Sequence, residues 1–162
     1  MPADPPVITA RAVVRALLAV VTEDLGGVEA MARLANDEAT NADNRAENKY
    51  DTRSLEASYL ARGQAERVVA LRRAASWLRG FREVEDADRV ALGTVVTLDV
   101  DGERRVIFLL PDEGGRTVEV HGVTVRTVTP KSPVAKAILG LEEGDGAETG
   151  TGVEIEILGI AG

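Results

Sequence analysis

Side chains able to do nucleophilic or metal chemistry are few in this 162-residue sequence. There is no cysteine, which excludes a thiolate metal site, a cysteine nucleophile and a disulfide framework. The one histidine, His121, cannot build a multi-histidine metal centre, and any Ser-His-Asp triad would have to use it. His121 lies in a strand-like run, where a packing or surface role is the ordinary expectation. The composition therefore excludes most chemistry that depends on cysteine or histidine.

A polar segment at residues 41–51 contains three carboxylates, those of Asp43, Glu47 and Asp51. Asparagine and aspartate at this density are typical of a turn between helices, where their side chains cap free backbone groups. Asp51 lies near the expected start of the following helix, where the helix dipole favours a negative charge. From the residues alone, these carboxylates are expected to be caps and solvated turn charges.

The net charge of −8 is unevenly distributed along the chain. Residues 1–82 hold 12 basic and 11 acidic side chains, whereas residues 83–162 hold 7 basic and 16 acidic ones. Such an asymmetry indicates two units with different roles. It also argues against independent binding of duplex DNA through a broad basic face.

The first half of the chain has the pattern of a helical hairpin. Apolar and small residues recur at alternating spacings of four and three, from Val14 to Ala42 and again from Ala57 to Leu78. Many of these seam positions are alanine, which lets helices approach closely but buries little area. The far end of the hairpin is therefore expected to be less stable than its base. Gly26-Gly27 is a further weak point, because glycine costs about 1 kcal/mol relative to alanine in a helix.

The second half has the pattern of a small β-rich domain with one helix. Asp101-Gly102 is a strong hairpin-turn signal. The helix is expected to begin at an N-cap, Ser132, with Pro133 in its first turn and Gly140 after its end. Valine-rich runs predict the strands, at Val90–Val100, Val106–Leu110, Val118–Val128 and Val153–Ile157. The sequence thus predicts an α+β fold: an antiparallel coiled-coil hairpin at 1–82, then an antiparallel β domain with one short helix at 83–162.

No segment has the pattern of a targeting or membrane-spanning sequence. The first six residues contain Asp4 and no basic residue, unlike a signal peptide. The most apolar run, Val13–Val21, is too short to span a bilayer and carries Arg15. A cytoplasmic protein without membrane partners is the expectation.

Two separated segments resemble the Gre family of bacterial transcript-cleavage factors. Glu47-Asn48-Lys49-Tyr50 is similar to part of the family's D-L-x-E-N-x-E-Y tip motif, which is a weak signal alone. Residues 132–145, SPVAKAILGLEEGD, closely resemble the family's SPIARALIGKEEGD segment. The final strand, Val153–Ile157, lies where the family has its E-Y-E-I strand. The resemblance extends in order along nearly the whole chain.

The resemblance implies a coiled-coil hairpin followed by an FKBP-like domain that docks on bacterial RNA polymerase at the rim of its secondary channel. The hairpin tip would reach the polymerase active site and help to cut a backtracked nascent RNA at its 3′ end. The protein would thus have no catalytic residues of its own and no cofactor when free. In the complex, Asp43 and Glu47 would share a Mg²⁺ ion with the polymerase, because hydrolysis uses two metals and carboxylates are ligands that Mg²⁺ accepts.

The same resemblance assigns residues to each role. The family's aspartate falls on Asn44, with Asp43 beside it, and asparagine is the poorer Mg²⁺ ligand. Tyr50 follows Asn48 one residue earlier than in the family motif. The tip comprises Asp43, Asn44, Glu47, Asn48, Tyr50 and Asp51. The docking residues are Ser132, Pro133 and Lys136. The possible RNA contacts, which otherwise belong to a solvated helix face, are Arg62, Arg67, Arg72 and Arg73.

Three alternatives stay open from the sequence. Because of Asn44, the chain could bind polymerase without stimulating RNA cleavage. The FKBP-like domain could be a peptidyl-prolyl isomerase, although such sites are lined with aromatic residues and residues 83–162 contain only Phe108. The hairpin could also be a coiled-coil interaction module with an unrelated partner.

Overall fold

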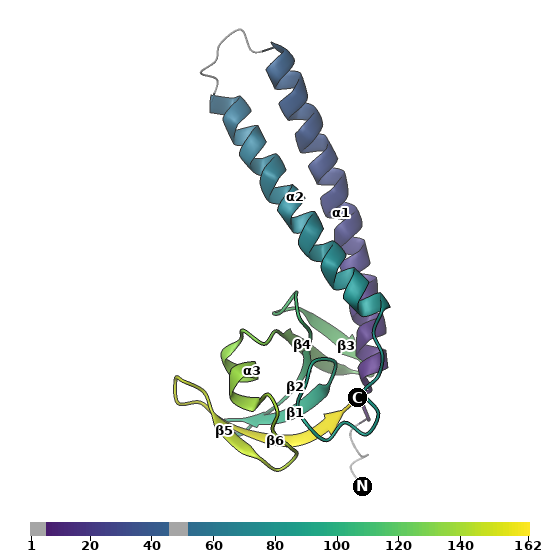
Figure 1. Cartoon of the computed structure of the whole chain (residues 1–162), viewed down its shortest axis with the longest axis vertical. Coiled ribbons are helices and arrows are strands. Elements are labelled where there is room, and N and C mark those ends of the chain that lie inside the picture. The colour runs from purple at the N-terminus through teal and green to yellow at the C-terminus, as the bar shows by residue number, and fades with distance from the viewer. Residues whose placement is uncertain (1–5, 46–51) are drawn as a thin grey trace. The chain divides into compact units, whose positions relative to one another are not determined.

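The protein is described by a computed structural model over residues 6–45 and 52–162. In this part of the chain two long helices precede a six-stranded sheet and one short helix (Figure 1), so the predicted α+β class is confirmed. The helices are α1 (Ala10–Arg45), α2 (Thr52–Arg79) and α3 (Pro133–Ile138). The strands are β1 (Val95–Val100), β2 (Glu103–Leu109), β3 (Thr117–Val120), β4 (Val123–Val128), β5 (Gly146–Glu148) and β6 (Glu154–Ala161).

The chain divides into two compact units. One consists of Met1–Leu18 together with Trp77–Gly162, and we call it the α/β unit. The other, Ala19–Ser76, is the hairpin unit. The start of α1 belongs to the α/β unit, where the Ala10 amide donates to the carbonyl of Gly162 at 3.3 Å. The functional roles predicted for 1–82 and 83–162 stay predictions.

In the hairpin unit, α1 and α2 run side by side in opposite directions (Figure 1). The seam positions whose side chains are described here are all buried or half-buried, from Val21 to Ala35 in α1 and from Ala61 to Ala75 in α2. Val21 and Leu71 are fully buried in this seam, whereas other large apolar side chains, such as Leu34 and Tyr59, are exposed. α1 continues to Arg45, past the predicted start of the turn at residue 41. Asparagine and aspartate disfavour an established helix only weakly, and adding a residue to a helix is easier than starting one.

The sheet of the α/β unit has the strand order β3-β4-β2-β1-β6-β5. Its strand pairs are antiparallel except for β2 and β4, which run parallel with Val106 opposite Val125. The expectation of a purely antiparallel sheet is corrected on this point. The chain leaves β2, crosses to the edge of the sheet as β3, and returns as β4, so β4 meets β2 in the same direction.

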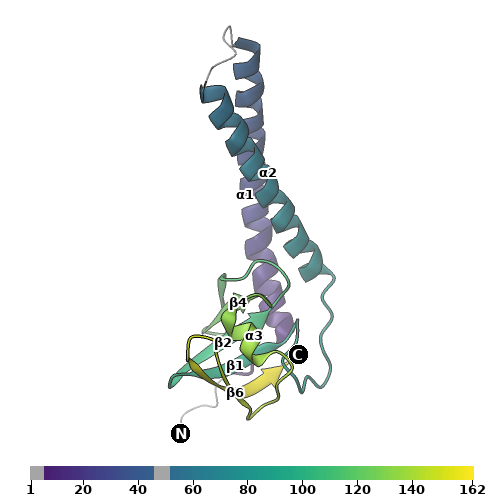
Figure 2. The ribbon, with the colours of Figure 1, turned by 60° about the vertical axis from the view of Figure 1, so that its left-hand side comes forward.

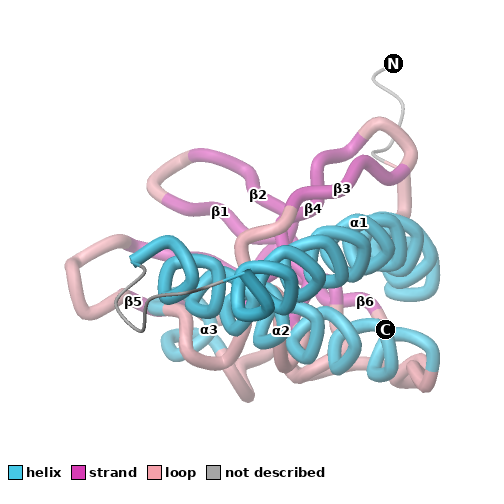
Figure 3. The backbone as a smooth tube through the Cα atoms, turned by 90° about the horizontal axis from the view of Figure 1, so that it is seen from above, coloured by secondary structure: helices cyan, strands magenta, loops and turns pink. Residues whose placement is uncertain are grey.

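Two tight hairpins shape one side of the sheet (Figure 3). Asp101 and Gly102, with φ of 51° and 84°, connect β1 to β2 as predicted. His121 and Gly122, with φ of 50° and 78°, connect β3 to β4. The sequence predicted one strand over Val118–Val128, which is wrong because this turn reverses the chain and divides the run into β3 and β4. His121 is therefore an exposed turn residue.

Apolar side chains are buried on both faces of the sheet. On one face α3 packs against β1, β2 and β6, with Ala135 and Ile138 fully buried (Figure 2). On the other face Phe108 meets Trp77 and Phe81, at ring-centroid distances of 6.2 and 6.1 Å. This aromatic cluster joins the end of α2 to the sheet inside the α/β unit. No helix in the described ranges is long and apolar enough to cross a membrane.

Several strand ends differ from the prediction. β1 begins at Val95, because Val90 instead exchanges backbone hydrogen bonds with Gly140 and Leu141. The three-residue strand β5 was not among the predicted strands. β6 continues to Ala161, and its pairing with β1 shifts register between Thr97 and Leu98. Such a bulge bends a sheet locally.

Candidate functional site: a groove beside helix α3

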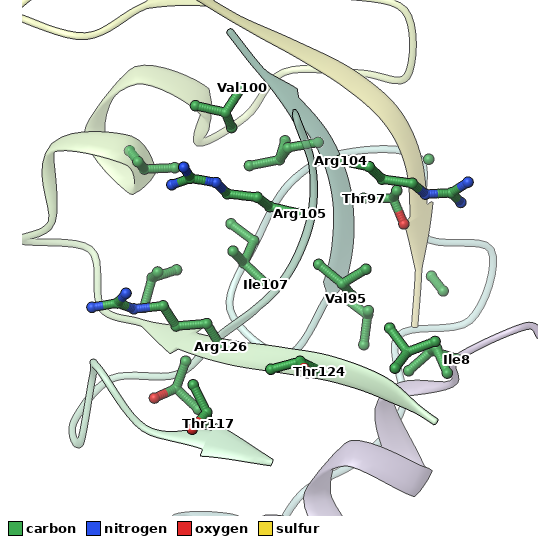
Figure 4. Close-up of a pocket in the computed structure, with 18 of the residues that line it drawn as sticks. Ile8, Val95, Thr97, Val100, Arg104, Arg105, Ile107, Thr117, Thr124 and Arg126 are labelled. Atoms are coloured by element: carbon green, nitrogen blue, oxygen red, sulfur yellow. The ribbon is translucent and has the colours of Figure 1, made fainter. Parts of the chain in front are cut away.

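A groove of about 1270 Å³ runs across the α/β unit (Figure 4). Residues of β1, β2, β3, β4 and the end of β6 line it, together with residues 6–8 and the segment that leads into α3. Leu98 and Ile107 contribute apolar atoms, and Ser132 and Val134 contribute the α3 side. The lining is thus mainly apolar, with hydroxyl groups and arginines placed among it.

Three arginines line the groove, and no Asp or Glu is among its described lining residues. Arg105 and Arg126 point to one side of the sheet, whereas Arg104 points to the other (Figure 4). Strand geometry explains this division, because successive side chains on a strand alternate between faces. Arg105 and Ile107 therefore share a face, and Ile107 lies directly opposite Arg126 in the β2–β4 pair.

The two arginines on the α3 side differ in their partners. Arg105 pairs with Glu103 at 3.1 Å, but both side chains are exposed, at 57% and 74%. Such a surface pair contributes little and exchanges readily with other partners. Arg126 makes no ion pair with any residue in the described ranges, and Ile107 and Thr117 flank it in the ladder. Both guanidinium groups are accessible to a ligand.

The three predicted docking residues lie at α3. Ser132 caps the helix as expected: its Oγ accepts a hydrogen bond from the Ala135 amide at 3.1 Å, and Pro133 follows in the first turn. Ser132 lines the groove, while Pro133 and Lys136 are exposed side chains outside its lining. Gly140, with φ of 82°, follows the end of the helix as predicted.

The crossover from β2 to β3 borders the groove, and an ion pair and hydrogen bonds fix its conformation. Glu113 and Arg116 form a largely buried ion pair at 2.8 Å. The Thr127 hydroxyl donates to the Glu113 carbonyl at 2.7 Å and accepts from the Arg116 amide at 2.9 Å. Arg116 is therefore a largely buried structural residue, whereas Arg105 and Arg126 are exposed.

The four arginines predicted to contact RNA are exposed on α2 in the hairpin unit. Arg72 donates to Glu29 on α1 through two nitrogen atoms, at 2.6 and 3.1 Å, and so links the two helices. Arg62 pairs with Glu66 one turn along α2. Arg67 and Arg73 lie on the same helix. Their role in binding RNA stays a prediction.

The predicted tip lies at the edge of what the structure describes. Asp43 and Asn44 belong to the last turn of α1, and their side chains are outside the described part. Glu47, Asn48, Tyr50 and Asp51 lie outside the described residues. Within the described ranges no group of three or more His, Asp or Glu side chains could hold a metal ion. The Mg²⁺ prediction therefore rests on the tip sequence alone.

Sequence reasoning did not find the groove arginines. A signal was present, because Arg126 occupies a polar position in the valine alternation of its strand, and Arg104-Arg105 directly precede the predicted return strand Val106–Leu110. What the pattern could not supply was the parallel pairing of β2 with β4, which puts Arg105 and Arg126 on one face.

No protein-family model matches the chain, and no curated protein matches it. Solved structures with some likeness include GreA factor homolog 1 (Gfh1) of Thermus thermophilus, with 22% identity, coverage of 90% of this chain and 94% of that one, and a TM-score of 0.38. Gfh1 of Thermus aquaticus shows 19% identity, coverage of 96% and 97%, and a TM-score of 0.34.

Proposed function

We propose that this protein is a Gre-like regulator of bacterial transcription. In this proposal the α/β unit docks on RNA polymerase and the helical hairpin enters the secondary channel. The observation that carries the proposal is the SPVAKAILGLEEGD segment, which resembles the family closely and builds the capped helix α3 beside the groove. In this segment Ser132 caps the start of α3 and also lines the groove, and Gly140 follows the end of the helix.

The surface of the hairpin unit supports insertion into an enclosing partner. Five large apolar side chains between 56% and 73% exposed lie on its two helices: Met31, Leu34, Leu55, Tyr59 and Leu60. Met31 and Leu34 lie on α1 and the other three on α2, so they are spread over both helices. The channel of a large protein complex would cover such side chains on several sides at once.

Beyond docking, the proposal includes a specific activity: the tip stimulates RNA cleavage. Asp43 and Glu47 would retain a Mg²⁺ ion at the polymerase active site, where carboxylate oxygens are suitable ligands. Asn44 at the position of the family's aspartate favours a second candidate, a regulator that binds the polymerase without stimulating cleavage. Both candidates share the same docking.

A cleavage assay on stalled transcription complexes tests the proposal and separates the two candidates. For a cleavage factor, the wild type shortens backtracked RNA and the Glu47→Ala variant does not. For a binding regulator, neither shortens the RNA, but the wild type competes with an authentic Gre factor. If the wild type neither shortens RNA nor competes, the polymerase proposal is wrong.

The isomerase alternative lacks structural support. No aromatic side chain is among the groove-lining residues that the structure describes, and Phe108 is buried against Trp77 and Phe81 on the other face of the sheet. A proline-isomerisation assay on a short peptide tests it directly, and we expect no rate increase.

A further inference from the structure

We infer that the protein forms a weak, reversible homodimer through one flank of its helical hairpin. The observation that carries the inference is an exposed apolar patch on that flank, where Met31, Leu34 and Leu60 are 58%, 64% and 58% exposed. In the dimer, Leu34 of each copy packs over Gly63 of the other copy. The inference goes beyond the proposed function, and its test needs no polymerase.

The seam between the two helices divides the hairpin surface into two flanks. Glu29 and Arg72, which form an ion pair across the helices, each directly follow a seam residue, Val28 and Leu71. Residues that directly precede a seam residue lie on the opposite flank, because each residue turns a helix by about 100°. We call this opposite side the apolar flank. It includes Val20, Gly27, Met31 and Leu34 on α1, and Leu60, Gly63 and Arg67 on α2.

On the apolar flank, Leu34 and Gly63 lie at nearly the same height on neighbouring helices. Leu34 is five residues beyond Glu29 on α1, and Gly63 is nine residues before Arg72 on α2. Side chains lean toward the N-terminus of their own helix, which puts the Cα atom of Glu29 nearer to the tip than that of Arg72. The remaining difference in height is within about one helical turn. No described atom lies within 4 Å of a Cβ added at Gly63, so this position has room for a side chain from outside.

A two-fold axis parallel to the hairpin makes the apolar flank complementary to itself. Such an axis places α1 of one copy against α2 of the other, so that Leu34 meets the open position at Gly63, and the same contact repeats across the axis. Met31 lies nearer to the seam than Leu34, because three residues fall about 60° short of a full helical turn, and Leu60 lies nearer than Gly63 for the same reason. Met31 and Leu60 therefore fill the centre of the interface. A second copy supplies both the protruding leucine and the opening at the matching spacing.

The size and charge of the apolar flank determine how strong the dimer should be. From Val20 to Glu38 the flank is about 27 Å long, and two helices are about 20 Å wide, so the dimer buries on the order of 1,000 Å² in total. Interfaces of this size are at the lower limit for specific association and are typical of transient complexes. The net charge of −8 on each copy also opposes association. We therefore expect a dimer at micromolar concentrations that salt favours, because salt screens the repulsion between the copies.

Sedimentation velocity of the 162-residue chain, over a concentration range up to about 200 μM, tests the inference. The wild type should shift from monomer toward dimer as its concentration rises. Gly63→Leu and Leu34→Glu should each weaken the dimer by about tenfold or more, the first by filling the opening and the second by burying an unpaired charge. Val69→Glu is the matched control, because Val69 is 51% exposed but directly follows the seam residue Val68 and lies on the other flank. This control should stay within about twofold of the wild type.

The folding of the hairpin and the direction of the axis are checked separately. Gly63→Leu should raise the thermal stability of the helix, since leucine is the better helix former, so its loss of association cannot come from unfolding. The absence of cysteine in the natural sequence allows cross-linking with single-cysteine variants. A mixture of Leu34→Cys and Gly63→Cys should give a disulfide between the two variants under oxidation. Gly26→Cys mixed with Gly63→Cys should not, because Gly26 follows a seam residue and lies on the other flank.

Several outcomes overturn the inference. A wild type that stays monomeric over the whole concentration range excludes the dimer. A stronger dimer in Gly63→Leu shows nonspecific contact between apolar surfaces instead of a fitted interface. An equal loss in Val69→Glu shows a general charge effect, and cross-links that form only between identical variants exclude the parallel two-fold axis. None of these outcomes bears on the proposed polymerase function, and a failure to bind polymerase leaves the dimer unaffected.

Discussion

The two units of this protein differ in how much large apolar side chain they bury. In the α/β unit many large side chains form the core, and Phe108, Leu109 and Ile138 are fully buried. In the hairpin unit Val21 and Leu71 are fully buried, but small residues occupy much of the seam, and Leu34 and Tyr59 are 64% and 73% exposed.

This difference predicts that the two units differ in stability. The free energy of burial scales with the apolar area removed from water, so an alanine-rich seam stabilises its helices much less than a core of phenylalanine, leucine and isoleucine. The α/β unit is therefore expected to be the more stable of the two. The hairpin leaves several large apolar side chains, such as Leu34 and Tyr59, in water, where they contribute nothing to its stability.

The largest expected effect comes from removing the centre of the aromatic cluster. Phe108→Ala should lower the free energy of unfolding by about 3–5 kcal/mol, because it deletes a buried ring and leaves a cavity. Urea unfolding followed by the fluorescence of Trp77, the only tryptophan, measures the change. Leu34→Ala in the hairpin should change stability by no more than about 0.5 kcal/mol.

Equal losses for these two variants would contradict the contrast between the units. If Phe108→Ala does not fold, Phe108→Leu gives a smaller, measurable loss of the same origin.

The next effect concerns Gly93, where the chain passes close to the aromatic cluster. Its φ is +86°, and an added Cβ would lie 2.8 Å from the Phe81 ring. Gly140 is the matched control, because its φ is +82° but open space surrounds it. Gly93→Ala should cost about 1–3 kcal/mol more than Gly140→Ala, since only the first adds a steric clash to the backbone strain. Thermal unfolding of both variants checks this, and equal melting temperatures would rule out tight packing at Gly93.

In the hairpin unit, substitutions should instead be able to increase stability. Gly26 and Gly27 lie inside α1 with no atom within 4 Å of an added Cβ. Gly26→Ala and Gly27→Ala should each stabilise the helix by up to about 1 kcal/mol. Slower amide hydrogen exchange in α1, with unchanged exchange in β1 and β2, is the expected observation. Unchanged exchange in α1 would show that these glycines are not its weak point.

The smallest effect is expected for the ion pair between the two long helices. A double-mutant cycle on Arg72→Ala and Glu29→Ala should give a coupling of about 0.2–1 kcal/mol, because Arg72 is exposed and the pair is screened by water. The coupling should vanish in about 1 M salt. The pair Arg62–Glu66, within α2, is the control that does not join the helices. A coupling well above this range would mean that charges, and not the seam, hold the hairpin together.

The sequence alone predicted the elements whose signals are local. The alternation of four and three residues predicted both long helices, and the described seam positions are indeed buried or half-buried. Ser132, Pro133 and Gly140 predicted the limits of α3, because capping and left-handed stops depend on a few neighbouring residues. The turn at Asp101-Gly102 was predicted for the same reason.

The tertiary structure decided what depends on residues far apart in the chain. His121-Gly122 was missed as a turn because a histidine in the left-handed region is uncommon, although it is tolerated there. The parallel pairing of β2 with β4 has no local signal, and it alone brings Arg105 and Arg126 to one face beside α3. The local sequence determined which helices and turns form. Strand pairing determined which side chains meet. A pairing is selected by how much apolar surface the whole sheet buries, and no single segment carries that information.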